Sequence, residues 1–469
     1  MTERGEKIPV PAAPGPTWPD PGLLPDGTGP GTGLPVAPHD PPPAHSRRGR
    51  WGLLAERDFR MLWLGETASG FGNALTTTAL PLIAVLTLQV STFQVGLLAA
   101  LVWIPWLVVG LPAGAWVDRI RRRPLMIACN LVSAGMFVSV PVAKWAGTLT
   151  FTHLVVAATV AGTTMVFFGT AYQVYLPTIV GKPDLIEGNA KMQGSEAATR
   201  VIGPGAGGLL TQWLGAVAGL FVDALTFLAS TVCLLLIRAR EPQVRRPERS
   251  EPLRRQIAVG FRFVVRDPYL RTILLWGAAL NLALNGWQAV QIVFLIKTVG
   301  LNAATVGVLL MVGSLGGVLG ALGARALSRW LGTGRGMVIC QLATAPFALL
   351  MPLASKGPAL ILYAVGALVV VGGVVACNIV MSGFRQSYCP PQMLGRAVAT
   401  SMVILHSTIP VGALLGGLLG EVLGPRPTMW IMTALFAPCA MLLLAGPIRR
   451  RRDLPSGYAA PSTTPDLTH

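Results

Sequence analysis

The sequence predicts an all-α integral membrane protein with twelve transmembrane helices in two six-helix pseudo-symmetric halves. Hydrophobic residues make up 52% of the chain and charged residues only 12%, whereas soluble domains average about 25% charged residues. The apolar residues fall into twelve stretches of roughly the 20 residues that a helix needs to cross a bilayer. Short motifs from the first half of the chain recur in the second half.

Apolar stretches separated by short polar loops give the positions of the expected spans. The first fifty residues contain no short apolar core of the kind found in signal peptides, so we expect the first span to direct membrane insertion itself. The spans are expected at Phe59–Leu88, Val95–Trp116, Leu125–Ala146, Thr152–Leu176, Ser195–Leu214, Ala216–Ile237, Thr272–Ile296, Thr305–Leu327, Met337–Leu353, Ala359–Ser382, Ala397–Leu423 and Thr428–Pro447.

The distribution of Lys and Arg predicts how these spans are oriented. If both termini lie on the same side, that side carries 32 of the 37 Lys and Arg residues, and Arg200 lies within a span. Loops rich in Lys and Arg stay in the cytoplasm. We therefore expect a multi-pass protein of the inner (cytoplasmic) membrane with both termini cytoplasmic. The net charge of +17 follows from this topology, so we expect no nucleic-acid partner.

The chain divides into five expected segments. Residues 1–55 form a Pro- and Gly-rich tail that is too poor in aliphatic residues to fold, with thirteen prolines in its first 45 residues. Residues 56–240 form the first bundle and residues 267–448 the second. Between them, residues 241–266 are basic and end in an amphipathic stretch that predicts a helix at the membrane surface. Residues 449–469 form a second cytoplasmic tail.

Several classes of chemistry are not expected. The six cysteines are scattered without a CxxC pair or a nearby His at ligand spacing, so we expect neither disulfides nor a metal site. The chain lacks the Gly-rich loop with Lys-Ser/Thr that binds nucleotide phosphates. It also lacks a recognisable nucleophile, base and orienting acid. We expect no cofactor and no enzymatic activity.

Internal repeats support two halves in parallel register. Ser91–Leu98 matches Asn302–Leu309 at an offset of 211, and Gly207–Leu210 matches Gly416–Leu419 at an offset of 209. Parallel repeats of this kind occur in transporters whose two halves rock about a central site.

Two motifs give the chain a closer resemblance. One is the turn between the second and third spans, Gly114–Arg123, and the other is the glycine-rich run Arg200–Gly208. In both motifs, and over nearly all of Phe59–Pro447, the chain resembles the major facilitator superfamily. The stretches Asn189–Ala190, Asp223–Phe227 and Pro391–Arg396 resemble the branch with the enterobactin exporter and macrolide-type efflux proteins.

The resemblance implies a cytoplasmic gate in the first motif. Asp118 would pair with nearby arginines and face the start of the eleventh span near Gly395 and Arg396, where a carboxylate is stabilised by about 0.3 to 1 kcal/mol. The alternative is an ordinary basic cytoplasmic turn. Arg121 stands where the family usually has a glycine. The expected gate residues are Gly114, Asp118, Arg119, Arg122 and Arg123.

The second motif resembles a helix-five signature that is associated with export in the family. Pro204 removes a helix hydrogen bond, and the spacing of Gly203 and Gly207 lets a neighbouring helix approach closely. Simple packing of two helices would also explain the glycines. The expected export motif is Gly203, Pro204, Gly207 and Gly208.

Ionisable groups inside the spans are candidates for proton coupling, because each costs roughly 2.5 to 3.5 kcal/mol at the bilayer centre. Glu66 shares a helical face with Ser69, Asn73 and Thr77, and could bind a proton or make a structural hydrogen bond. Glu196 and Arg200 are four residues apart and could form a structural ion pair or a protonation switch. His406 could relay protons or simply pack. The candidates are Glu66, Glu196, Arg200 and His406.

Polar stripes on the expected first, fourth, seventh and tenth spans predict a substrate cavity, since these spans line the central cavity in the superfamily. Packing between helices through polar side chains is the alternative for any one stripe. The predicted cavity residues are Asn73, Gln173, Asn281, Asn285, Gln288, Asn378 and Arg385.

Together these patterns predict a secondary active transporter that exports an amphipathic small molecule, such as a drug, siderophore or secondary metabolite, by proton-coupled alternating access. We expect a monomer whose partners are the substrate, protons and the lipid bilayer. Two alternatives remain open. One is a lipid or lysolipid flippase of the same fold, and the other is a non-transporting membrane protein that recruits partners.

Overall fold

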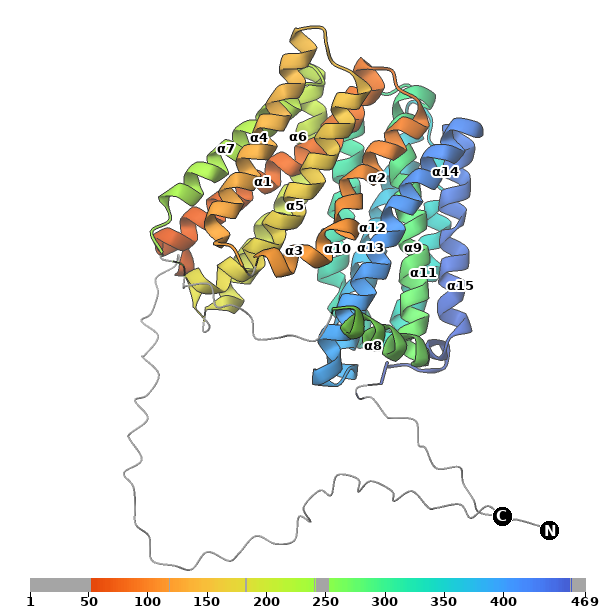
Figure 1. The fold of residues 1–469 in the computed structure, drawn as a ribbon. Coiled ribbons are helices and arrows are strands. Elements are labelled where there is room, and N and C mark those ends of the chain that lie inside the picture. Colours follow the sequence, from red (N-terminus) through yellow and green to blue (C-terminus); the bar gives the residue numbers. More distant parts are fainter. Residues whose placement is uncertain are drawn as a thin grey trace, which may run out of the picture. The chain divides into compact units, whose positions relative to one another are not determined.

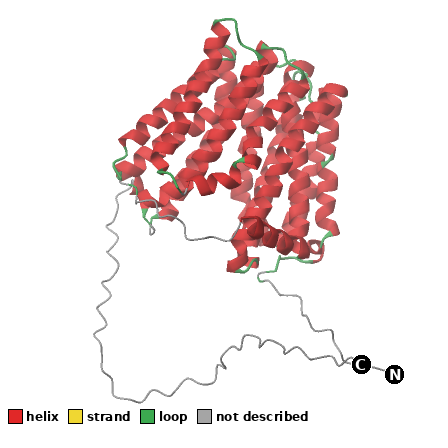
Figure 2. Ribbon diagram, viewed as in Figure 1, coloured by secondary structure: helices red, strands yellow, loops and turns green. Residues whose placement is uncertain are grey.

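A computed structural model describes residues 52–117, 119–181, 184–239, 241, 253–455 and 457. Within these residues the regular structure is helical throughout (Figure 2). The predicted N-terminal tail lies outside the described residues up to position 51. Residues 52–55, which the sequence assigns to that tail, form the short 3-10 helix η1 with Leu53 fully buried. The predicted second tail is described at 449–455 and 457 only.

The helices before the linker are called the first half, and those after it the second half. The linker end is the end of the bundle that holds η1, α8 and η5, and the other is the opposite end. The first half contains α1 (Arg57–Leu82) with its π-helical extension η2 (Ile83–Thr87), α2 (Thr92–Val108), α3 (Gly110–Val117), α4 (Arg122–Trp145), α5 (Phe151–Val180), α6 (Leu185–Leu214) and α7 (Ala218–Leu236).

The linker contributes one described helix, α8 (Leu253–Arg266), where the sequence predicts a helix at the membrane surface. The second half contains α9 (Pro268–Val293) with the π-helical η3 (Phe294–Thr298), α10 (Ala303–Leu331), α11 (Thr333–Ala348), η4 (Met351–Leu353), α12 (Leu360–Tyr388), α13 (Pro391–Val422), α14 (Pro425–Ala434), α15 (Phe436–Ala445) and η5 (Pro447–Arg450).

Ten helices within the described residues are long and apolar enough to cross a membrane, so this is a multi-pass membrane protein. The sequence predicts twelve spans, and that count is not confirmed. Two predicted spans are missing from the ten. One is α2, which is apolar but ends after 17 residues, before Gly110 and Pro112. The other is α6, which has 30 residues but a polar first half.

Side chains at the helix starts explain several boundaries. Ser91 and Gln94 form a reciprocal capping box at the start of α2, which satisfies backbone N–H groups that lack a partner inside the helix. Asn302 accepts a hydrogen bond from Thr305 N in the corresponding place on α10 (2.8 Å). Asp267 accepts from the first turn of α9. The short loops between spans are therefore encoded locally.

The helices of each half pack as a group (Figure 1). Apolar clusters fill each half, and a few residues such as Leu82 and Val293 belong to the cluster of the other half. In the first half, α1 packs on α6 and α7, and α4 packs on α5 and α7. In the second half, α9 packs on α13 and α14, and α10 packs on α12. The two halves meet mainly where α2 lies against α13 and α6 lies against α10.

Glycine pairs bring the two halves into direct backbone contact at the opposite end. A Cβ on Gly96 of α2 would lie 2.8 Å from the Cα of Gly417 on α13, and one on Gly208 of α6 would lie 2.7 Å from the Cα of Gly307 on α10. Such distances leave no room for any side chain at the contact. The opposite end is thus closed by helix backbones that touch each other.

Candidate functional site

The register between α1 and α6 brings two carboxyl groups together. Both helices run from the linker end to the opposite end, and Gly203 packs on Ala74 while Gly207 packs on Leu75 and Thr78. This register places Glu66 level with Glu196, so that the two carboxyl groups lie near each other. The Oε1 atom of Glu66 is buried and has no hydrogen-bond partner among the described residues. An unpaired buried carboxyl oxygen is costly unless the group is neutral or later finds a partner.

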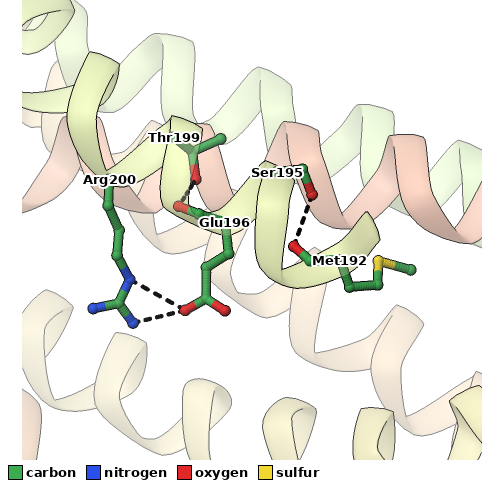
Figure 3. Close-up of polar contacts among 5 residues, drawn as sticks. All are labelled: Met192, Ser195, Glu196, Thr199 and Arg200. Atoms are coloured by element: carbon green, nitrogen blue, oxygen red, sulfur yellow. Dashed lines mark hydrogen bonds and ion pairs between the residues drawn. The ribbon is translucent and has the colours of Figure 1, made fainter. Parts of the chain in front are cut away.

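Glu196 is already paired on its own helix (Figure 3). Its Oε1 accepts hydrogen bonds from Arg200 Nη2 at 2.7 Å and Nε at 3.2 Å. The pair is open rather than packed, with side-chain exposures of 47% for Glu196 and 75% for Arg200. The neighbouring hydroxyls of Ser195 and Thr199 bond back to their own helix and leave the pair alone.

Arg200 lies on the side of α6 that faces the second half. It precedes Pro204 by about one helical turn, and the Pro204 carbonyl lies 2.6 Å from where a Cβ on Gly307 of α10 would be. Glu196 and Arg200 lie on the linker-end side of that contact, and both side chains are exposed there. The ion pair therefore stands where the two halves part.

Tyr172 of α5 lies near the carboxyl groups of both Glu66 and Glu196. The sequence indicates Tyr172 only as an aromatic residue flanking the cavity. Next to it, the predicted cavity residue Gln173 is exposed, as is Asn73 on α1. Three helices of the first half thus contribute polar groups to one region.

His406 does not belong to the carboxyl cluster. Its ring stacks on Trp106 of α2 with centroids 5.5 Å apart and lies 5.8 Å from the ring of Trp103. The Nδ1 atom lies 2.8 Å from the carbonyl of Met402 on the same helix. The imidazole therefore packs between the halves, which the sequence could not indicate because Trp103 and Trp106 lie some 300 residues away.

The amide stripe on α9 is only partly available to a ligand. Asn281 donates to the carbonyl of Leu405 on α13 (3.4 Å), and Asn285 donates to the carbonyl of Asn281 (2.8 Å). Gln288 is exposed. Hydrogen bonding between helices thus accounts for Asn281, while Gln288 keeps its side chain free of any hydrogen bond within the described chain.

On α12, Asn378 is exposed and Arg385 is half-buried. The Nε of Arg385 is buried without a hydrogen-bond partner in the described part of the chain. It faces a small cavity between α9, α12 and α13, which is lined by Leu270, Ile273, Leu274, Met381, Arg385, Ser401 and Leu405. Of the predicted substrate residues of the second half, Arg385 alone lines this largely apolar cavity.

Asp118, the acidic residue of the predicted gate, lies outside the described residues. Gly114 belongs to α3, and Arg119 is exposed in the turn that follows. Near Gly395, where the partner surface is expected, a Cβ would meet open space. The gate contact between Asp118 and the start of α13 stays a prediction.

The gate arginines Arg122 and Arg123 are instead held within the first half. The carboxylate of Glu241 accepts hydrogen bonds from the backbone N–H of Arg122 (3.1 Å) and Arg123 (2.5 Å). In return, the Arg123 guanidinium donates to the carbonyls of Leu234 (2.8 Å) and Leu235 (2.9 Å) at the end of α7. These bonds tie the start of α4 to the end of α7.

The second half repeats this arrangement. Asp453 accepts a hydrogen bond from Thr333 N at the start of α11 (2.9 Å), and the Thr333 hydroxyl accepts one from Leu454 N (2.8 Å). The offset between Glu241 and Asp453 is 212, close to the offsets of the other repeats. Each half thus ends with an acidic residue that caps the start of its third long helix. The repeat offset between Glu241 and Asp453 could have revealed this pair in the sequence.

Replacing Glu241 by Ala is expected to loosen the start of α4. Loss of a capping acceptor costs about 1 kcal/mol, so we expect a lower melting temperature and faster hydrogen exchange at the amides of Arg122 and Arg123. Glu56→Ala, which removes another half-buried acid of the linker end outside α4 and α7, is the control for general loss of negative charge. Unchanged exchange at α4 in Glu241→Ala would show that the cap contributes nothing.

Asp223 on α7 is fully buried and accepts hydrogen bonds from the hydroxyls of Thr76 and Thr226. It lies against Gly72 of α1, where any Cβ would collide with its carboxyl group. This carboxyl is therefore a packing element of the α1–α7 contact.

Comparisons with known proteins agree with the resemblance to the major facilitator superfamily that the sequence shows. The family model described as Major Facilitator Superfamily matches residues 62–407. The "Multidrug efflux pump Tap" of Mycolicibacterium fortuitum is 29% identical over 413 residues, covering 84% of this chain and 97% of that protein. An "Uncharacterized MFS-type transporter y4rN" of Sinorhizobium fredii is 26% identical, covering 76% of this chain and 87% of that protein.

Solved structures share the fold at low identity. A bacterial homologue of the iron transporter ferroportin in its inward-facing state matches with a TM-score of 0.67 at 17% identity, covering 84% of this chain and 99% of that chain. The outward-facing state of such a homologue gives a TM-score of 0.56 at 16% identity, covering 84% and 100%. The nucleoside transporter NupG gives 0.67 at 12% identity, covering 84% and 100%.

Proposed function

Because the chain belongs to the Major Facilitator Superfamily, we propose that it is a secondary active transporter that exports amphipathic small molecules in exchange for protons. The similarity to a multidrug efflux pump supports organic compounds as its substrates. The observation that carries proton coupling is the carboxyl pair, in which the Oε1 of Glu66 is buried and unpartnered beside Glu196. Burial and a nearby negative charge both favour the protonated form of a carboxyl group.

In this proposal Glu66 is the coupling carboxyl, and the pair of Glu196 and Arg200 responds to its charge. When Glu66 holds a proton, Arg200 neutralises Glu196 as the structure has it. When Glu66 loses its proton, a second negative charge attracts Arg200 toward α1. Such a shift moves a cation at the point where the halves part, so proton release and a change in the cavity would be linked. His406 is not needed for this step.

The substrate path would use the exposed amides Asn73, Gln173, Gln288 and Asn378. The half-buried Arg385 would lie beside the path. Asn281 would mainly hold α9 to α13, and Asn285 bonds back to its own helix. With few unpaired fixed charges and several indole and phenol rings, this lining suits molecules with both apolar and hydrogen-bonding surface.

Orientation and topology complete the proposal. We infer twelve spans in two six-helix halves. In this count α2 and α3 together form one span with a break in the middle, and α6 forms one continuous span. The linker end, which carries most Lys and Arg, would be cytoplasmic in the inner membrane.

Closure at the opposite end then corresponds to an inward-facing state, and the higher TM-score with the inward-facing ferroportin homologue supports this state. Asp118 would contact α13 in the outward-facing state. We propose a monomer.

The test is proton movement in everted membrane vesicles that contain the protein and a pH-sensitive dye. We expect certain macrolides or siderophores to trigger proton release from energised vesicles, and an uncoupler to abolish their accumulation. About 180 mV provides about 4 kcal/mol per charge, enough for roughly a thousandfold gradient.

Two outcomes would contradict the proposal. Transport of lysolipids that is insensitive to the uncoupler would indicate a flippase instead. No movement of any compound, in vesicles whose protein content is verified, would favour a membrane protein that only recruits partners. Vesicles with the empty expression vector are the control for host transporters.

A further inference from the structure

Two charged residues of the second half hold the start of α2 at the opposite end. Glu421, in the last turn of α13, accepts a hydrogen bond from Phe93 N in the first turn of α2 (Oε2 to N, 3.3 Å). Lys297, in η3, donates to the carbonyl of Val90 just before that helix (Nζ to O, 2.9 Å). The short segment Val90–Phe93, called the α2 entry, is thus bound from two different helices across the interface.

The chemistry of both contacts is favourable. A carboxylate at a helix N-terminus interacts with unpaired backbone N–H groups and with the positive end of the helix dipole. A lysine ammonium bound to a carbonyl makes a charge-assisted hydrogen bond. Glu421 is exposed. Both contacts are therefore strengthened by the charge of a side chain from the second half.

Helix packing places Glu421 over this helix start. Gly417 lies against Phe93 and Gly96, and a Cβ on Gly420 would lie 2.5 Å from the Cγ2 of Thr92. Glu421 follows on the same face of α13. Separation of α2 from α13 must therefore break the Glu421 contact, and separation of η3 from the α2 entry must break the Lys297 contact.

The other half of the interface has no such charges. With the repeat offsets of 209 and 211, Glu421 corresponds to Gln212 and Lys297 corresponds to Leu86. Both of these residues are exposed. Along α6 and α10 the opposite end is closed by the Gly208–Gly307 contact. The ionic contacts thus lie on one side of a pseudo-symmetric interface.

We propose that Glu421 and Lys297 form a one-sided clamp on the α2 entry that stabilises the state in which the opposite end is closed. The clamp must release in every transport cycle, because the substrate path can open at this end only when α2 and α13 separate. Its two residues tune how often the opposite end opens without touching the carboxyl cluster or the substrate path.

Hydrogen–deuterium exchange of the full chain in lipid nanodiscs tests the clamp without substrate or proton gradient, so the result does not depend on the proposed export. In Glu421→Gln and in Lys297→Gln we expect amides in the first turn of α2 to exchange about two- to fivefold faster. Because opening of this end also separates α6 from α10, amides in the first turn of α10 should accelerate as well. The double variant should exceed either single one.

Lys144→Gln is the matched control, since Lys144 is an exposed lysine at the same end whose side chain has no hydrogen bond or ion pair in the described structure. It should leave both first turns unchanged. Acceleration at Phe93 alone, with α10 unaffected, would reduce Glu421 to a local helix cap and overturn the clamp. Wild-type exchange at both helices in the double variant would overturn it too. Unchanged melting temperatures of the variants would exclude misfolding as the cause of faster exchange.

Discussion

Replacing Glu66 by Gln is expected to uncouple the transporter. The amide has nearly the same size as the carboxyl and can still donate a hydrogen bond, but it cannot release a proton. Since a gradient of about 180 mV supports roughly a thousandfold accumulation, the accumulation ratio of a transported compound should fall to near unity. The measurement is dye-reported proton release from everted vesicles, together with uptake of the same compound.

Two matched variants make this prediction specific. Glu196→Gln retains Glu66 but removes the partner of Arg200, so we expect weaker coupling rather than none. His406→Gln removes an imidazole that packs against Trp103 and Trp106, so we expect proton release to persist. If proton release survives in Glu66→Gln and disappears in Glu196→Gln or His406→Gln, then the coupling group is the one whose loss abolishes it.

Valine at Gly416 and at Gly417 should fail in different ways, although the two residues are adjacent. A Cβ at Gly416 would lie 2.2 Å from the carbonyl oxygen of Gly286 on α9, inside the second half. Overpacking of a core usually costs about 1 to 3 kcal/mol and occasionally more. With backbone on the other side of the contact, we expect Gly416→Val to lose more than about 3 kcal/mol or to yield no folded protein.

Gly417 instead faces the first half, where a Cβ would lie 3.1 Å from the Cα of Gly96. Gly417→Val is therefore expected to fold with a nearly normal melting temperature but to force the opposite end apart. Thermal unfolding in detergent separates the two variants, and hydrogen exchange at α2 and α10 reports the opening. A stable Gly416→Val, or a Gly417→Val whose opposite end stays closed, would contradict this interpretation of the glycines.

The approximate positions of most helices are determined by local sequence. Apolar stretches, Ser91 and Asn302 at helix starts, and proline-containing turns indicate most boundaries without tertiary information. The sequence places the start of one span at Ser195, whereas α6 begins at Leu185. Its first ten residues are too polar for a span, yet they continue the helix beyond the apolar segment.

Conversely, the break between α2 and α3 appears in the structure where the sequence predicts one continuous span. Pro105 and Pro112 weaken the backbone hydrogen bonding on either side of Val109 and Gly110. Apolar composition continues through the break, so hydropathy alone could not reveal it.

The candidate site likewise contains contacts that local sequence predicts and contacts that it does not. The pair of Glu196 and Arg200 follows from i, i+4 spacing and could be predicted. The approach of Glu66 to Glu196 depends on how α1 packs along α6, and the contact of Glu421 with Phe93 joins residues 328 positions apart. Contacts of this kind depend on packing between helices that are distant in the sequence, so no short stretch of sequence reveals them.

The caps provided by Glu241 and Asp453 have a consequence for biosynthesis. Arg122 and Glu241 are 119 residues apart, and Thr333 and Asp453 are 120 apart. At about 5 to 20 residues per second, a ribosome needs roughly 6 to 24 s to deliver each acidic residue after its helix start has emerged. During that interval the first turn of α4 or α11 lacks its acidic cap. Each half therefore gains this cap only when its last residues leave the ribosome, and a chain truncated before Asp453 would lack the cap of α11 permanently.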